Sequence, residues 1–286
     1  MNKDFYQDVT NRIVAAIEAG TPPWVRPWSV SDQRPHNAAT KRPYRGINTV
    51  LLGLETGLKG YATSAWLTYR QAAGLGGQVR GGERGTSVVL YKLHELPDTD
   101  GEKKVIPLMR CFTVFNIAQI DGLPETPTQP AQPTPWSASA EAEAVLTASG
   151  ADIRYGTAQA YYHPAKDAIY LPEKNAFTDP GAFYSTALHE AVHWSGHPTR
   201  CNRNLSGRFG GDAYAVEELI AELGSAFLCA HCRIDGRLQH AAYLHSWLQV
   251  LKADKRAIFT ASAKAQQAAD LLLGSVQIEE AEEVAA

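Results

Sequence analysis

The sequence lacks any uninterrupted apolar run of about 18 residues, the length that a helix needs to cross a membrane. Its first twenty residues carry scattered charges in an amphipathic pattern, without the basic start and apolar block of a signal peptide. The pattern therefore favours neither a membrane protein nor a secreted one. We expect a cytoplasmic protein with no membrane partner.

Cysteine is scarce, with 4 among 286 residues and no regular spacing that would predict a disulfide framework. This usage is typical of a protein in a reducing cytoplasm. Cys229 and Cys232 alone stand close together, and no second pair completes a four-cysteine zinc site. We interpret them as packed helix residues, the alternatives being half of a zinc site or a redox pair.

Excess charge of one sign is also small, since 27 basic and 30 acidic residues give a net charge of −3. The total hides an asymmetry along the chain. Residues 1–125 hold 15 basic and 12 acidic residues, a net +3, which leaves 12 basic and 18 acidic residues, a net −6, for the remainder. A basic N-terminal half and an acidic C-terminal half predict two domains with different partners.

One motif indicates a particular chemistry, the HExxH sequence of residues His189 to His193. Two histidines four residues apart leave the same face of a helix, so both imidazoles can bind one metal ion. Asp179 as N-cap and Pro180 at the first helical position predict a helix that begins shortly before the motif. Glu190, next to the first histidine, is the predicted general base of a zinc peptidase.

A catalytic zinc site takes three protein ligands and keeps one position open, so a third ligand is required. His197 lies on the same helix face, but Thr199 stands where the longer three-histidine pattern needs a histidine. Glu218, in an apolar helical pattern, is the better candidate. Glu222, one turn later, would accept the second ring N–H of a ligating histidine. Glu217 remains an alternative to Glu218.

Aromatic and basic side chains alternate in the stretch of residues 22–54. Single-stranded nucleic acid is bound by this mixture, because flat rings stack on bases at about 1–3 kcal/mol each and cations follow the phosphates. A loop whose tryptophans cover the core and whose arginines are solvated explains the composition equally well. The candidate DNA contacts are Trp24, Trp28, Arg42, Tyr44 and Arg45.

Periodicity and breakers predict an α+β chain of two domains. The N-terminal domain is expected at residues 1–120, with helices before a small antiparallel sheet, and the C-terminal domain at 138–286. Residues 121–137 contain five prolines and predict an extended, semi-rigid linker that sets the domains apart. The expected helices are 4–19, 48–58, a third that begins after residue 61 and ends near 74, 141–149, 217–228, 241–252 and 255–273. The expected strands are 86–93, 105–117, 153–162 and 168–171.

Five further motifs, in order along the chain, resemble the N-terminal single-stranded-DNA-binding domain of the ArdC antirestriction family. They are PW…RPW, KRPYRGIN, the WxTYRQ of residues 66–71, the GxVRGGERG of 77–85 and the FTVFNIAQ of 112–119. Related domains occur in plasmid TraC-type primases. The HEAVH and EELIAE stretches resemble the zincin-like metallopeptidase domain that follows in the same family. Residues 40–43 depart from the pattern, because the turn there lacks an expected glycine.

The resemblance implies a plasmid-type antirestriction protein that binds single-stranded DNA and protects incoming conjugative DNA from host restriction. It implies a gluzincin-like site in which His189, His193 and Glu218 bind Zn²⁺, with Mn²⁺ as an alternative. The predicted DNA contacts then also include the motif residues Asn48, Trp66, Tyr69, Arg80 and Arg84.

Two other functions fit the same residues. In the first, the protein is a metallopeptidase, and thus a hydrolase. Its binding to single-stranded DNA keeps it near a DNA-bound or restriction-system protein. Alternatively, it would be a non-catalytic DNA-binding protein with a structural metal site, in which His197 supplies a fourth ligand. A competent site and an unused one need the same three ligands, so both hypotheses stay open at this point.

Overall fold

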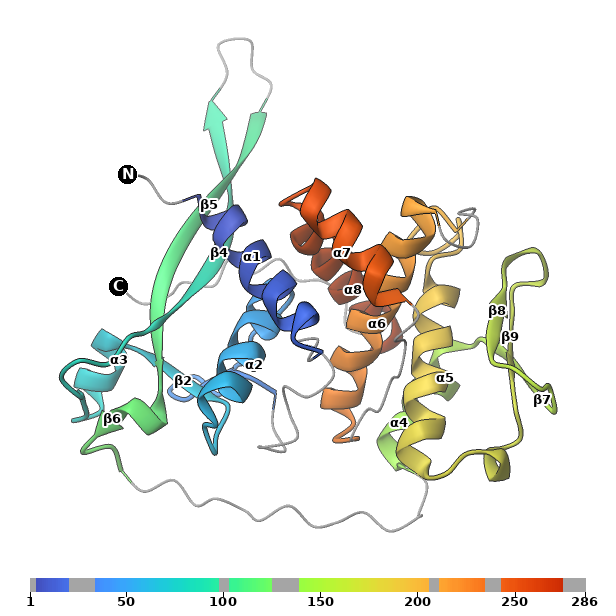
Figure 1. Cartoon of the computed structure of the whole chain (residues 1–286), viewed down its shortest axis with the longest axis horizontal. Coiled ribbons are helices and arrows are strands. Elements are labelled where there is room, and N and C mark those ends of the chain that lie inside the picture. The colour runs from blue at the N-terminus through green and yellow to red at the C-terminus, as the bar shows by residue number, and fades with distance from the viewer. Residues whose placement is uncertain are drawn as a thin grey trace.

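A computed structural model of the chain describes residues 4–20, 34–97, 103–124, 139–205, 211–234 and 243–274, without the side chains of 91–109 and 212. The N-terminal part combines short helices with two small sheets (Figure 1). Its helices are α1 (Phe5–Glu18), α2 (Ile47–Lys59), α3 (Tyr69–Gly74) and the 3-10 turn η1 (Ile117–Gln119). Its strands are β1 (His36–Asn37), β2 (Ala65–Thr68), β3 (Gln78–Val79), β4 (Thr86–Pro97), β5 (Lys103–Asn116) and β6 (Ile120–Asp121).

The larger sheet of this part has the strand order β1-β2-β5-β4. Strands β1 and β2 pair in parallel, and the other pairs are antiparallel, while β3 and β6 form a separate antiparallel pair. Register partners run along the β4–β5 hairpin from Thr86↔Val114 to Pro97↔Lys103. Figure 1 shows that this hairpin extends as a long arm beyond the helices.

The C-terminal part is mainly helical and carries one three-stranded sheet of order β7-β9-β8. Its helices are α4 (Ala140–Ser149), α5 (Pro180–Ser195), α6 (Asp212–His231), α7 (Leu244–Ala253), α8 (Ala257–Leu272) and the 3-10 turns η2 (Pro164–Lys166) and η3 (Lys174–Ala176). Its strands are β7 (Asp152–Tyr155), β8 (Tyr161–His163) and β9 (Ala168–Leu171). Among the residues described, no helix combines the length and the apolar character needed to span a bilayer.

Two predicted elements differ from the structure. The strand expected over residues 153–162 is two strands, because Gly156 takes a φ of +95° and turns the chain after β7. The segment before Tyr69 is the strand β2 and not the beginning of a helix. Thr68 ends that strand and caps α3, since its hydroxyl accepts the backbone N–H of Gln71 at 3.2 Å.

The two parts of the chain share one hydrophobic core. Val9 and Ile13 of α1 belong to the same buried cluster as Trp247 and Ile258 of the C-terminal helices. The Thr10 hydroxyl donates to the backbone oxygen of Lys255 at 2.9 Å. Figure 1 shows α1 and α2 beside the helices α7 and α8. The expectation that the two domains are set apart is therefore wrong. Residues 125–137 of the predicted linker lie outside the described residues, and the domain boundaries stay a prediction.

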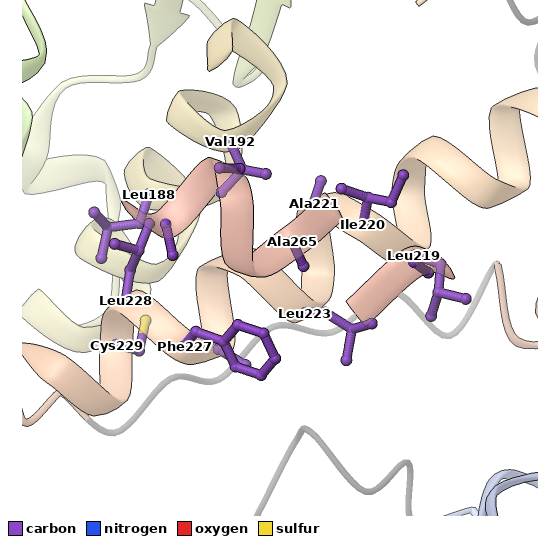
Figure 2. Packing of buried hydrophobic residues seen from close by; sticks show 14 of the residues in the cluster. Leu188, Val192, Leu219, Ile220, Ala221, Leu223, Phe227, Leu228, Cys229 and Ala265 are labelled. Carbon is purple, nitrogen blue, oxygen red and sulfur yellow. The ribbon is translucent and has the colours of Figure 1, made fainter. Parts of the chain in front are cut away.

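Close contact among α5, α6 and α8 fixes the framework of the C-terminal part. Figure 2 shows the buried side chains that these helices contribute. Gly224 of α6 lies where the three helices meet: a Cβ added there would lie 2.8 Å from Cγ2 of Val192 and 3.5 Å from the backbone oxygen of Ala265. Glycine is therefore needed for the approach of α5 to α6.

Gly224→Ala should destabilise the protein by roughly 1–2 kcal/mol. Overpacking typically costs about 1–3 kcal/mol, and the better helix propensity of alanine offsets about 0.5–1 kcal/mol of that. The double variant Gly224→Ala/Val192→Ala should lose less than the sum of the two single losses, because the removed methyl groups make room for the new one. Urea unfolding of the three variants measures this, and additive losses would contradict it.

Candidate metal centre

The HExxH helix begins as the sequence predicts. The Asp179 carboxylate accepts the backbone N–H of Ala182 at 2.9 Å, and Pro180 is the first helical residue. His189 and His193 then lie one turn apart on one face of α5, with ring centroids 4.8 Å apart and ring planes at 80°. Their Nε2 atoms approach to 3.1 Å, so both point to the same place.

Glu218 of α6 meets the two histidines from the neighbouring helix. Its Oε2 lies 3.6 Å from Nε2 of His189, and its Oε1 lies 3.6 Å from Nε2 of His193. Ligand atoms from these three residues all lie within 4.8 Å of one another. The structure thus brings together the three side chains that the sequence singles out as ligands.

The spacing of these atoms fits a divalent ion. Bonds of about 2.0–2.1 Å in a tetrahedral site place neighbouring ligand atoms roughly 3.3 Å apart. The separations of 3.1, 3.6 and 3.6 Å lie on either side of that value. Two imidazoles and one carboxylate are also a ligand set that zinc accepts and that manganese tolerates.

The electrostatics of the site also favour a cation. Burial lowers the pKa of His193, but the hydrogen bond to Glu217 and the charges of neighbouring glutamates outweigh it and raise that pKa to about 9. Burial raises the pKa of Glu218, but the hydrogen bond from His189 and the charges of both histidines lower it to about 2. Negative charge therefore surrounds the point where the Nε2 atoms converge.

Both histidines face a carboxylate with their second ring nitrogen. Glu222, which the sequence predicts to orient the ring of His189, has its Oε2 3.6 Å from Nδ1 of that ring, so its role stays a prediction. Glu217 Oε1 lies 3.2 Å from Nδ1 of His193. Glu217 therefore faces Nδ1 of His193 and not Nε2, and it lies outside the group of converging ligand atoms.

His197 does not join the converging group. Its Nδ1 lies 2.8 Å from the hydroxyl oxygen of Thr199. Among the residues that the structure describes, the group that could hold a metal ion has only three members, His189, His193 and Glu218. A closed four-ligand site with His197 as the fourth ligand is therefore not what the described part of the chain forms.

Sequence reasoning missed two tyrosines beside the site. The Tyr214 hydroxyl lies 3.0 Å from that of Tyr243 and forms a hydrogen bond with Glu218. Burial, the Tyr243 hydroxyl and the charge of Glu218 all raise the pKa of Tyr214, which keeps this phenol protonated. Tyr214 stands four residues before Glu218 on one helix face, and that spacing was the available signal. Tyr243 lies 25 residues after Glu218, and no spacing in the sequence indicates that it is close to the site.

Trp24 and Trp28, two of the predicted DNA contacts, lie outside the described residues. Five of the others have exposed side chains: Arg45 and Arg80, which are paired with acidic residues, and the further three, Arg42, Tyr69 and Arg84. Tyr69 is 53% exposed, and its ring meets that of Phe115 edge to face at 6.5 Å. These three residues are therefore placed where a nucleic acid can reach them.

Two predicted arginine contacts already have acidic partners. Arg45 forms an ion pair with the buried Asp270 of α8. Arg80 donates to Glu83 at 2.8 Å and to Asp121 at 3.2 Å. A phosphate would compete with carboxylates for both guanidinium groups.

Three further predicted contacts take part in the packing of the N-terminal part. Trp66 is fully buried, so its indole has no face on which a base can stack, and that assignment is corrected. Tyr44 is half-buried against the same cluster. The Asn48 side-chain amide donates to the backbone oxygen of Val89 at 2.7 Å and accepts its N–H at 2.8 Å, which holds α2 to β4.

Comparison with known protein families divides the chain in the same way. Residues 3–115 match the N-terminal domain of anti-restriction factor ArdC, and residues 140–264 match a zincin-like metallopeptidase family. The uncharacterized protein y4eC of Sinorhizobium fredii is 43% identical over an alignment of 282 positions, which covers 93% of this chain and 91% of the relative. The DNA primase TraC of Escherichia coli is 39% identical over an alignment of 300 positions, which covers 97% of this chain but 28% of the primase.

Two solved structures are similar over almost their whole length. The metal-free crystal structure of the antirestriction protein ArdC from the R388 plasmid has a TM-score of 0.83 and 46% sequence identity, over 95% of this chain and 97% of that one. The Mn(II)-bound structure of the same protein has a TM-score of 0.80 at the same identity, over 95% and 98%. This extent of likeness, together with both domain matches, shows that the chain belongs to the ArdC antirestriction family.

Proposed function

We propose that this protein binds single-stranded DNA and protects incoming conjugative DNA from host restriction, and that its second domain is a metal-dependent peptidase. The observation that carries the proposal is the likeness to plasmid ArdC over 97% of that chain, in both domains. The net charge of +3 over residues 1–125 supports a polyanionic partner for the first domain.

Exposed side chains of the N-terminal part supply the chemistry that a single strand needs. Tyr69 offers a ring for base stacking, and Arg42 and Arg84 offer cations for the phosphates. Asn37 links the loop that carries Arg42 to α3, since its side-chain amide donates to Gln71 at 3.0 Å. A stacking ring and a basic loop are thus anchored to the same short helix.

The triple variant Arg42→Ala/Tyr69→Ala/Arg84→Ala should bind single-stranded DNA about 10- to 100-fold more weakly. One lost stacking contact is worth about 1–3 kcal/mol, and each lost phosphate contact reduces the salt slope by about 0.7. Lys252→Ala is the control. This exposed lysine of α7 pairs with Glu18 and is not one of the predicted DNA contacts. Fluorescence anisotropy at two salt concentrations measures both quantities. A triple variant with wild-type affinity and salt slope would contradict these contacts.

In the peptidase domain, His189, His193 and Glu218 would hold Zn²⁺ or Mn²⁺. The ion, when bound, supplies Lewis acidity that polarises the scissile carbonyl and acidifies a coordinated water. Glu190 then accepts the proton of the attacking water and delivers it to the leaving amine. Glu190 is buried and follows His189 directly in the chain, and its charge contributes to the raised pKa of His193, which supports this role.

The protonated Tyr214 phenol supports this chemistry through Glu218. It donates a hydrogen bond to that carboxylate, which holds the carboxylate in position. A set of three protein ligands leaves a fourth position for water, which favours a catalytic site over a closed structural one. A protein of the host restriction system is the peptidase target that we propose, since it would be met at the same DNA.

Conjugation into a restricting recipient tests the proposed function. A plasmid that carries recognition sites is transferred into cells with and without an active restriction system, in the presence and absence of this protein. The protein should raise transfer into restricting cells towards the frequency seen in restriction-deficient cells. Transfer that stays low with the protein present would contradict the antirestriction role.

A further inference from the structure

The loop between α5 and α6 carries two arginines with different partners. Arg200 pairs with Asp167 beside the small sheet, and its guanidinium lies over the Trp194 ring, 3.7 Å from the centroid. Arg203, three residues later, turns inward and is buried. The two side chains have the same chemistry, so their partners decide what each contributes.

Arg203 holds the carboxylate of Glu217 in a two-point contact. Its Nε donates to Oε2 at 2.9 Å, and its Nη2 donates to Oε1 at 2.8 Å. A bidentate arginine fixes both the position and the rotation of a carboxylate, which a single contact does not. The pair is buried, and its charges compensate each other there.

The same guanidinium also anchors the end of the HExxH helix. Nη2 donates to the backbone oxygen of Val192 at 2.6 Å, and Nη1 donates to the Ser195 hydroxyl at 2.9 Å. Gly196 leaves the room for this side chain, because a Cβ there would lie 2.9 Å from Nη2. Arg203 therefore joins the last turn of α5 to Glu217 of α6.

The held carboxylate is the one that faces His193. Glu217 Oε1 lies 3.2 Å from Nδ1 of His193, while Nε2 of the same ring points to Glu218 and His189. A carboxylate on one ring nitrogen sets the tautomer and rotation of the imidazole, and thus the direction of the other nitrogen.

We propose that Arg203 is a positioning residue for the metal centre, which acts through Glu217 to aim Nε2 of His193 at the ion. The inference rests on the proposed metal site and adds to it a residue outside the ligand set. Without Arg203 the carboxylate of Glu217 can rotate away, and its charge is left uncompensated in a buried place. His193 then keeps its position in the chain but loses a fixed ring orientation.

Isothermal titration of the metal-free protein with Mn²⁺ and Zn²⁺ tests this inference without reliance on activity. Glu217→Gln and Arg203→Lys should each weaken metal binding by about 10- to 100-fold, the range seen when outer partners of metal ligands are replaced. Arg200→Lys is the matched control from the same loop. It removes the planar stack on Trp194 without touching the ligand set, so its metal affinity should stay at the wild-type value.

The double variant Arg203→Lys/Glu217→Gln separates positioning from a general loss of stability. If Arg203 acts through Glu217, the metal affinity of the double variant should be about equal to that of the single variant with the lower metal affinity. Thermal unfolding of each metal-free variant is the second readout. Metal affinities that equal the wild type in both single variants, or that fall equally in Arg200→Lys, would overturn the inference. A wild-type protein that binds neither ion would contradict the metal centre itself, and the inference with it.

Discussion

Glu190→Gln should leave the metal ion bound and lower peptide hydrolysis by about 10²- to 10⁴-fold, the usual contribution of a positioned general base. The amide has nearly the shape of the carboxylate but cannot accept the proton of the attacking water. Glu190 is buried beside the ligands without being one of the three converging residues. Its replacement therefore removes proton transfer and spares metal binding.

Glu218→Gln is the comparison that separates loss of the general base from loss of the metal ion. The same change of acid to amide, on the neighbouring helix, removes a ligand charge, so metal affinity and hydrolysis should fall together. Isothermal titration gives the affinity, and a mixture of quenched fluorescent peptides gives the hydrolysis. A Glu190→Gln protein that cleaves at the wild-type rate would contradict the role of Glu190, and so would one that has lost its metal.

Trp66→Ala should destabilise the protein by about 3–5 kcal/mol, the usual cost of truncating a fully buried tryptophan. The indole packs with Leu52, Val88 and Val114, between α2 and the larger sheet. Its N–H has no hydrogen-bond partner among the described residues, so Trp66→Phe should cost much less. Chemical unfolding measures both variants.

Tyr69→Ala is the counterpart for an aromatic residue of the same motif. Tyr69 is 53% exposed, so its truncation should change stability by less than about 0.5 kcal/mol. Binding of single-stranded DNA should weaken instead. If Tyr69→Ala unfolds the protein, or if Trp66→Ala leaves stability unchanged, the division of these two rings between DNA and core is wrong.

The histidine pair of the candidate metal centre was predictable from the sequence because its signals are local. Four-residue spacing puts His189 and His193 on one face of a helix, and Asp179 and Pro180 fix where that helix begins. The choice between Glu217 and Glu218 was not local. It depends on the rotation of α6 against α5, which the packing around Gly224 sets.

Contacts between distant segments were beyond the sequence pattern. Nothing in the spacing of Arg203 indicates that it reaches Glu217, because the loop that carries it has no periodicity. The amphipathic pattern of α1 predicted a buried face but not that α7 and α8 cover it. Trp66 and Tyr69 look alike in a motif, but Trp66 lies in β2 and is buried, while Tyr69 begins α3 and is exposed.

The measurement that tests the proposed function most directly is an anisotropy titration of the protein with single-stranded and duplex oligonucleotides at two salt concentrations. We expect a strong preference for the single strand and an affinity that falls as salt rises, because phosphate contacts release counterions. Equal affinity for both forms, or no binding at low salt, would contradict the role of the N-terminal domain in protecting incoming DNA.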